Sequence, residues 1–66
     1  MATLKENEEI REILQAMEGI EKHMSAGAAS AKMGQWICAE TELELAMETY
    51  KRVKVRMSKL ISGGVL

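Results

Sequence analysis

Two series of residues recur every seven positions in the second half of the chain, and they constrain its fold more than any other feature. The first series is bulky and the second is mostly small; they are Trp36, Leu43, Tyr50 and Met57, and Ala39, Ala46, Val53 and Leu60. A seven-residue apolar repeat forms one stripe along an α-helix, where it can pack against a second helix. The pattern predicts a helix over about residues 35–62, whose seam sets large side chains against small ones.

A second apolar stripe lies in the first half of the chain. Its members follow one another at the spacings of a single helix face, and they are Ile10, Ile13, Leu14, Met17, Ile20 and Met24. Thr3 and Glu6 precede the stripe with the spacing of a capping box, in which side chains satisfy the free N–H groups of the first helical turn. The sequence therefore predicts a first helix over about residues 4–26.

The segment between the two predicted helices, residues 27–34, is rich in glycine and alanine. Gly27 is expected to end the first helix because glycine accepts the left-handed conformation, and Ser30 could cap the second. Alternatively the alanine-rich stretch continues the helix, although Gly27 and Gly34 would each cost about 1 kcal/mol there. The expected fold is all-α: one antiparallel two-helix hairpin domain, residues 1–66, with a flexible tail over 63–66.

Charge is distributed unevenly along the chain. All ten acidic and four of the nine basic residues lie in residues 1–48, and the other five basic residues lie in residues 49–66. An antiparallel hairpin would place the acidic start of helix one beside the basic end of helix two. The net charge of −1 gives no overall attraction to nucleic acid or to an anionic membrane. Arg52, Arg56 and Lys59 nevertheless form a basic stripe that could contact phosphates.

The chain carries more apolar residues than two helices can bury against each other, because each helix offers its partner one stripe. The residues expected in the hairpin core are Ile10, Ile13, Leu14, Ile20, Leu43, Ala46, Tyr50, Val53, Met57 and Leu60. Those expected to bind a partner are Trp36, Ile37, Leu45, Met47, Val55, Met17 and Met24. Methionine adapts well to irregular partner surfaces. Trp36 has two interpretations, a bulky core residue or an anchor for another protein.

Nothing in the sequence indicates catalysis or a cofactor. The carboxylates of the second helix are expected to form a solvated face, since a hairpin has no cleft to shift their pKa values; they are Glu40, Glu42, Glu44 and Glu48. His23 is expected at the surface or near the end of the first helix. Cys38 has no basic neighbour in sequence and is expected to be a small, half-buried filler. A single cysteine also excludes an internal disulfide and a cysteine-based metal site.

The length of 66 residues predicts marginal stability, because a domain of this size buries only about 60% of its unfolded surface. A partner chain or a second copy of the chain would supply the missing contacts. The first residues are charged from Lys5 onward, unlike a secretory signal, and no apolar run approaches the roughly 18 residues of a membrane span. We therefore expect a cytoplasmic protein with no membrane segment.

Part of the chain resembles the YscE-like family of small co-chaperones of type III secretion needle subunits. The resemblance is carried by Trp36 followed by Leu43-Glu44-x-Ala46-Met47, and by Ile20-Glu21-Lys22-His23-Met24 before the turn, and it covers about Ile20 to Val53. The glycine- and alanine-rich connector and the Gly-Gly-Val-Leu end differ from the family.

The resemblance implies a cytoplasmic, non-enzymatic protein that acts with a tetratricopeptide-repeat (TPR) chaperone. Together the two would keep the needle subunit monomeric until export. The alternative is a homodimeric four-helix bundle acting as a regulator of the phage or plasmid type. In that alternative Arg52, Arg56 and Lys59 are the candidate contacts to an acidic partner or to nucleic acid.

Overall fold

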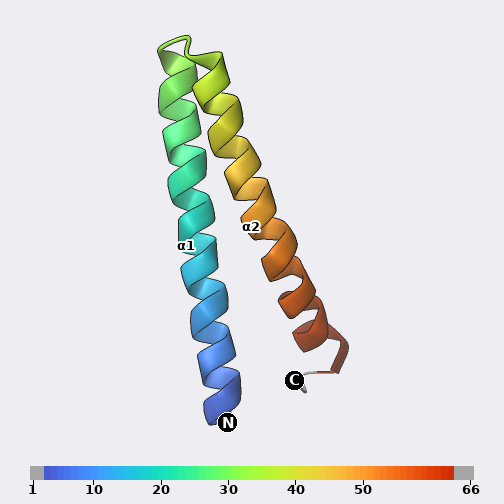
Figure 1. Ribbon diagram of the computed structural model, residues 1–66. Coiled ribbons are helices and arrows are strands. Elements are labelled where there is room, and N and C mark those ends of the chain that lie inside the picture. The colour runs from blue at the N-terminus through green and yellow to red at the C-terminus, as the bar shows by residue number, and fades with distance from the viewer. Residues whose placement is uncertain (1–2, 64–66) are drawn as a thin grey trace.

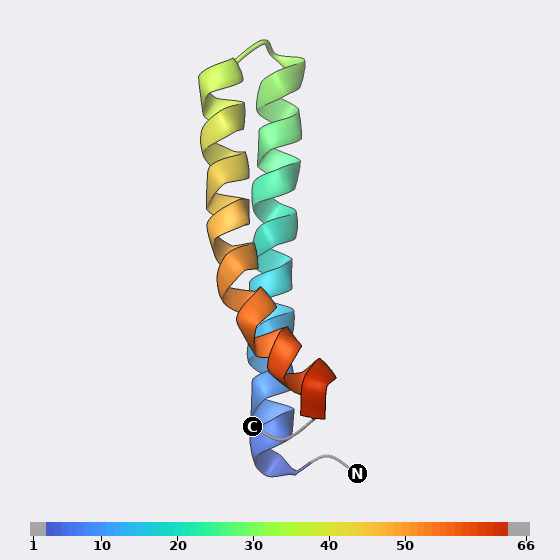
Figure 2. The same ribbon diagram turned by 90° about the vertical axis from the view of Figure 1, so that its right-hand side faces the viewer.

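Two long antiparallel α-helices form the hairpin. The computed structural model describes residues 3–63, in which α1 spans Leu4–Lys32 and α2 spans Trp36–Gly63. The start of α1 and the end of α2 lie at the same end of the hairpin, and a short turn joins the helices at the other end (Figure 1). Seen from the side, α2 crosses α1 at a shallow angle (Figure 2). The predicted all-α helical hairpin is confirmed.

The first helix begins at the predicted cap. The hydroxyl oxygen of Thr3 accepts a hydrogen bond of 3.1 Å from the backbone N–H of Glu6. The same hydroxyl donates to the Glu6 carboxylate, also at 3.1 Å. These bonds satisfy one of the N–H groups that a helix leaves free at its start, and the carboxylate lies at the positive end of the helix dipole.

The first helix ends later than expected. It continues to Lys32 instead of ending near residue 26, so the alternative of a continuing helix is right for residues 27–32. Alanine has the highest helix propensity of all residues, and four alanines between residues 26 and 31 offset the cost of Gly27. Gly27 is buried against α2 and therefore belongs to the packed part of the helix.

The turn between the helices occupies residues 33–35 and depends on Gly34, whose φ is +74°. The N–H of Gln35 donates to the carbonyl of Ser30 at 2.9 Å, and the N–H of Gly34 donates to the carbonyl of Ala31 at 3.0 Å. This pair of bonds is the Schellman motif that ends many helices. Ser30 therefore belongs to the end of α1 and does not cap α2. Of the predicted tail, residue 63 closes α2, and residues 64–66 lie outside the described residues.

Replacing Gly34 with alanine is expected to destabilise the hairpin by about 1–2 kcal/mol, because an L side chain is strained at positive φ. Gly19→Ala is the matched control. It lies inside α1 with no atom within 4 Å of the added Cβ, so it should stabilise the hairpin by about 1 kcal/mol. Thermal unfolding followed by far-UV circular dichroism measures both. A stabilising Gly34→Ala would contradict the turn described above.

Small side chains line the contact between the two helices. The buried apolar residues of the described chain are Ile13, Ala39, Ala46 and Val53, each at most 7% exposed. Near the turn, a Cβ added to Gly27 would lie 3.5 Å from the carbonyl oxygen of Ala39. The helices therefore approach closely at this end of the hairpin, where the facing residues on both sides are small.

Several large residues predicted for the core lie outside it. Ile13, Ala46 and Val53 are buried as expected, and Ile20, Met57 and Leu60 are partly buried. The predictions for the remaining four core residues, which are exposed, were wrong: Ile10, Leu14, Leu43 and Tyr50. The small seven-residue series of α2 faces α1, and the bulky series lies about 40–60° further around the helix. Close approach at the small series turns the bulky side chains to one side of the hairpin.

Candidate interaction surface

Most of the large apolar side chains that the core leaves out gather on one broad side of the hairpin. Two grooves between the helices lie on this side. The groove nearer the turn is lined by Ile20, Met24, Leu43, Ala46, Met47 and Tyr50. The groove nearer the open end is lined by Ile10, Ile13, Leu14, Met57, Leu60 and Ile61. Met17 lies seven residues from both Ile10 and Met24 and continues their row on α1.

We define the apolar face as the large residues of this side that the hairpin does not bury. They are Ile10, Leu14, Met17, Met24, Leu43, Met47, Tyr50, Met57 and Ile61. All but Met57 are at least 43% exposed. The face follows the long axis of a hairpin whose Cα atoms span 47 × 16 × 11 Å. Single chains in water rarely expose a contiguous apolar patch above a few hundred Å², so a face of this length indicates an interaction surface.

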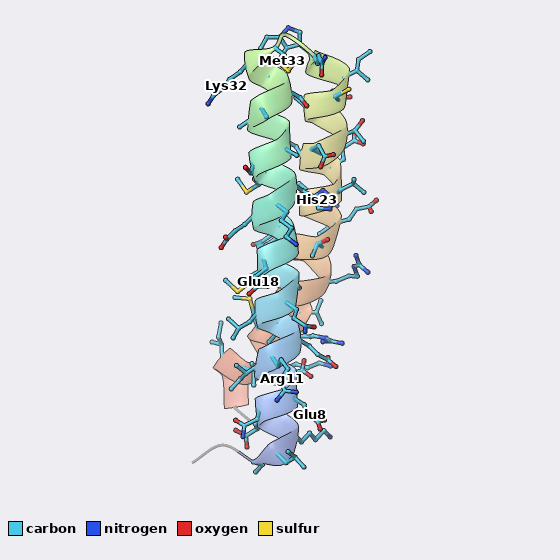
Figure 3. The ribbon with its side chains drawn as sticks, turned by 90° about the vertical axis from the view of Figure 1, so that its left-hand side faces the viewer. Glu8, Arg11, Glu18, His23, Lys32 and Met33 are labelled. Atoms are coloured by element: carbon cyan, nitrogen blue, oxygen red, sulfur yellow. The ribbon has the colours of Figure 1, made fainter. Side chains whose placement is uncertain are left out.

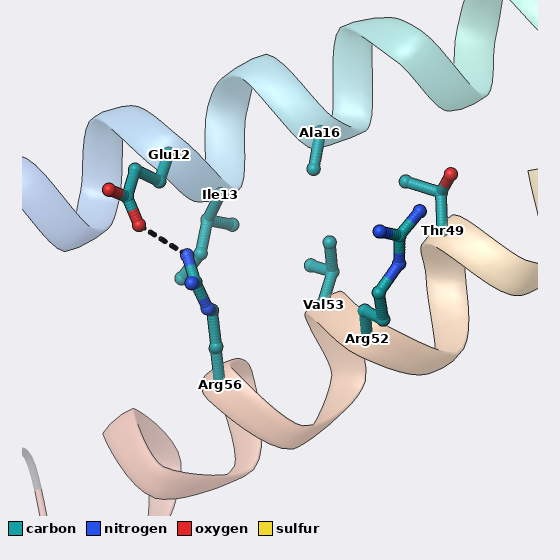
Figure 4. A pocket seen from close by; sticks show the side chains of 7 residues that line it. All are labelled: Glu12, Ile13, Ala16, Thr49, Arg52, Val53 and Arg56. Carbon is teal, nitrogen blue, oxygen red and sulfur yellow. Dashed lines mark hydrogen bonds and ion pairs between the residues drawn. The ribbon is translucent and has the colours of Figure 1, made fainter.

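The opposite broad side of the hairpin is polar. It carries a third groove, lined by Glu12, Ile13, Ala16, Thr49, Arg52, Val53 and Arg56 (Figure 4). There the guanidinium of Arg56 forms an ion pair with Glu12, and its Nε lies 3.4 Å from Oε1 of Glu9. This confirms the predicted contact between the acidic start of α1 and the basic end of α2. Exposed pairs of this kind contribute less than about 1 kcal/mol each, so they orient the helices more than they stabilise them.

His23 and Glu42 form a polar contact between the helices that the sequence interpretation missed. Nδ1 of His23 lies 2.6 Å from Oε2 of Glu42, and both side chains are partly buried. Figure 3 shows His23 at the border of α1 with α2, whereas Arg11 and Glu18 point away from α2. His23 is therefore not at the end of α1, and Glu42 does not belong to the solvated face. Spacing in the sequence is the signal that could have found the contact. His23 follows Ala16 by seven residues, and Glu42 lies three residues after Ala39 and four before Ala46, next to the row that faces α1.

The residues predicted to bind a partner are all exposed, but they do not form one surface. Met17, Met24 and Met47 belong to the apolar face. Leu45 precedes Met47 by two positions and Val55 precedes Met57 by two. Because two positions correspond to about 200° around a helix, Leu45 and Val55 point away from that face.

The start of α2 forms an exposed tip beside the turn. Trp36 is 69% exposed and continues the bulky seven-residue row of α2 beyond the apolar face, so the core interpretation of this residue was wrong. Ile37 is 82% exposed and lines neither apolar groove. Cys38 is a free, exposed thiol and not the half-buried filler that we expected.

Neither a metal centre nor a membrane span is found in the described part of the chain. No group of three or more His, Cys, Asp or Glu residues within residues 3–63 is placed to hold a metal ion. Over the same residues, neither helix combines the length and the apolar character needed to cross a bilayer. Comparison with family models, curated proteins and solved structures gave no match to the chain. The resemblance to the YscE-like family therefore stays a prediction.

Proposed function

We propose that this hairpin is a non-enzymatic interaction subunit that binds another protein through its apolar face. The observation that carries the proposal is the segregation of side chains in the hairpin. One broad side holds most of the exposed large apolar residues, with two grooves, while the other holds the ion pairs of Arg56. Fully burying an exposed apolar side chain is worth about 1.5–3 kcal/mol, so covering several half-exposed ones would stabilise a complex.

A helical partner fits this surface best. The grooves lie between two antiparallel helices, and such grooves accept the apolar side chains of a third or fourth helix. Their linings combine methionines with branched residues, as in Met24, Met47 and Leu43, and methionine adjusts to the shape of the partner. The hairpin would then complete a helical bundle with its partner.

The specific form of the proposal follows the resemblance. It is a cytoplasmic co-chaperone that, with a TPR-type chaperone, keeps a type III secretion needle subunit monomeric. TPR proteins present an extended concave surface of stacked helices, which could receive the apolar face of the hairpin. Leu43 and Met47 support the link, because they carry the resemblance and also belong to the apolar face.

The alternative regulator that contacts nucleic acid has less support. Of its three candidate contacts, Arg56 is engaged with Glu9 and Glu12 of the same chain. A phosphate would have to compete with these carboxylates for the guanidinium. The alternative also includes pairing of two copies of the chain, and such pairing could use the same apolar face.

Affinity capture with matched variants tests the proposal. Tagged wild-type chain and Ile37→Glu are expected to recover the same TPR-type protein and small needle-like subunit from the native host in mild salt. Leu43→Glu should recover neither, because it places a charge in the apolar groove nearer the turn. Identification is by mass spectrometry. Equal recovery by Leu43→Glu would refute the role of the apolar face, and recovery of nucleic acid instead would favour the regulator.

A further inference from the structure

We propose that, in the absence of another partner, a second copy of this chain covers the apolar face, and that the two copies pair head to tail. The proposal rests on the proposed function, in which the apolar face is the interaction surface. It adds that a second copy of the chain can cover this face, and it specifies how α2 of one copy is aligned with α2 of the other. Both follow from the order of residues along α2.

The edge of the apolar face is a row on α2 that is complementary to itself. Glu40, Met47, Lys54 and Ile61 are spaced by seven residues, and Met47 and Ile61 line the two apolar grooves. Met47 lies midway between Glu40 and Lys54. If α2 packs antiparallel to α2 of a second copy about a two-fold axis at Met47, each Glu40 lies opposite Lys54 of the other copy.

The neighbouring row is compatible with this axis to within half a residue. Trp36, Leu43, Tyr50 and Met57 are symmetric about a point between residues 46 and 47. An axis there places Leu43 opposite Tyr50 of the other copy, and exposed Trp36 opposite Met57. A two-fold interface requires this reciprocity, in which residue i contacts residue j and j contacts i.

The overall charge of the hairpin also favours the head-to-tail orientation. The half nearer the turn, residues 17–48, carries six acidic and two basic residues. The open half, residues 3–16 and 49–63, carries seven basic and four acidic residues. A head-to-tail pair superimposes halves of opposite sign, whereas pairing with both turns at one end superimposes halves of like sign. Charge complementarity of this kind sets the orientation of an interface more than its affinity.

The size of the broad side is compatible with a dimer interface. The broad side of the hairpin measures 47 × 16 Å between Cα atoms, about 750 Å², close to the roughly 800 Å² per partner of a standard interface. Two hairpins joined through this side form a four-helix bundle with antiparallel neighbours. The apolar grooves of both copies would then line its core.

Exchange of the two charged residues tests the register. Glu40→Lys alone would set the introduced lysine against Lys54 of the other copy, twice per dimer, and Lys54→Glu alone would likewise set two glutamates against each other. We expect each variant to dimerise about tenfold more weakly than wild type, and an equal mixture of the two to recover wild-type affinity, since the mixed dimer restores both opposite-charge pairs. Sedimentation equilibrium measures all three, and Lys59→Glu, which makes the same charge change as Lys54→Glu at a residue that lines neither apolar groove, should match wild type.

Recovery on mixing would support this register, because misfolding of either variant alone cannot explain it. Failure of the mixture to recover wild-type dimer affinity would overturn the register. The wild-type chain provides a second test without substitution. Spin labels on exposed Cys38 should lie roughly 30–40 Å apart in a head-to-tail dimer, at 1.5 Å per helical residue, and below about 25 Å in the parallel one. The shorter distance, or a wild-type chain that sediments at 7.3 kDa, would overturn the proposal. The affinity capture of a helical partner could still succeed in that case. The proposed function is therefore tested separately from the dimer.

Discussion

Ile13→Ala is expected to cost the hairpin about 2–5 kcal/mol of unfolding free energy, the usual range for truncating a buried isoleucine. Ile13 is 7% exposed and is the largest of the buried apolar side chains between the helices. The other buried apolar residues are two alanines and a valine, so little else could compensate for its loss. With so small a core, this cost is comparable to the whole stability of a small domain, and most of the molecules should unfold.

Leu14→Ala is the matched control for this prediction. The adjacent side chain has similar size but is 53% exposed on the apolar face, and its truncation should cost the isolated hairpin less than about 1 kcal/mol. Urea unfolding at a concentration where the chain is monomeric, followed by circular dichroism, compares the two. Equal losses would mean that Leu14 is part of the core and that the side assigned to the apolar face is wrong.

Met47→Asp should abolish the association of two copies of the chain while leaving the helices formed. Met47 is 54% exposed in the hairpin and lines the apolar groove nearer the turn. An unpaired carboxylate buried in an interface costs several kcal/mol, so the dissociation constant should rise about 100-fold or more. Sedimentation equilibrium measures association, and circular dichroism checks that the variant is still helical.

Leu45→Asp distinguishes the two sides of α2. The sequence predicts Leu45 as one of the residues that bind a partner. In the structure it points away from the apolar face, and we expect Leu45→Asp to associate like the wild type. Loss of association in Leu45→Asp but not in Met47→Asp would place the interaction surface on the polar side of the hairpin.

The sequence predicted the helices well because their signals are local. The cap at Thr3 and the small series that includes Ala46 and Val53 follow from spacing within one helix. The position of the turn was predicted less well. Both Gly27 and Gly34 suit a helix end, and the choice depends on tertiary packing, which buries Gly27 against α2.

The interaction surface was predicted in its composition but not in its shape. Seven-residue spacing identifies two adjacent rows on α2, and it does not say which row faces α1. We assigned the bulky residues Leu43 and Tyr50 to the core by size, whereas in the structure the row of Ala39 and Ala46 is buried against α1. Exposure of the apolar face is thus a consequence of how closely the helices pack, which is not visible in either helix alone.

Oxidation of the methionines by hydrogen peroxide tests most directly whether the apolar face is covered. Met17, Met24 and Met47 belong to the face, while Met33, 72% exposed in the turn, lines neither groove and is an internal control. Mass spectrometry would compare the rate at each methionine in the associated protein and in dilute monomer. We predict several-fold slower oxidation of Met17, Met24 and Met47 on association, with Met33 unchanged. If association left the oxidation rates of Met17, Met24 and Met47 unchanged, or slowed the oxidation of Met33 alone, the apolar face would not be the interaction surface.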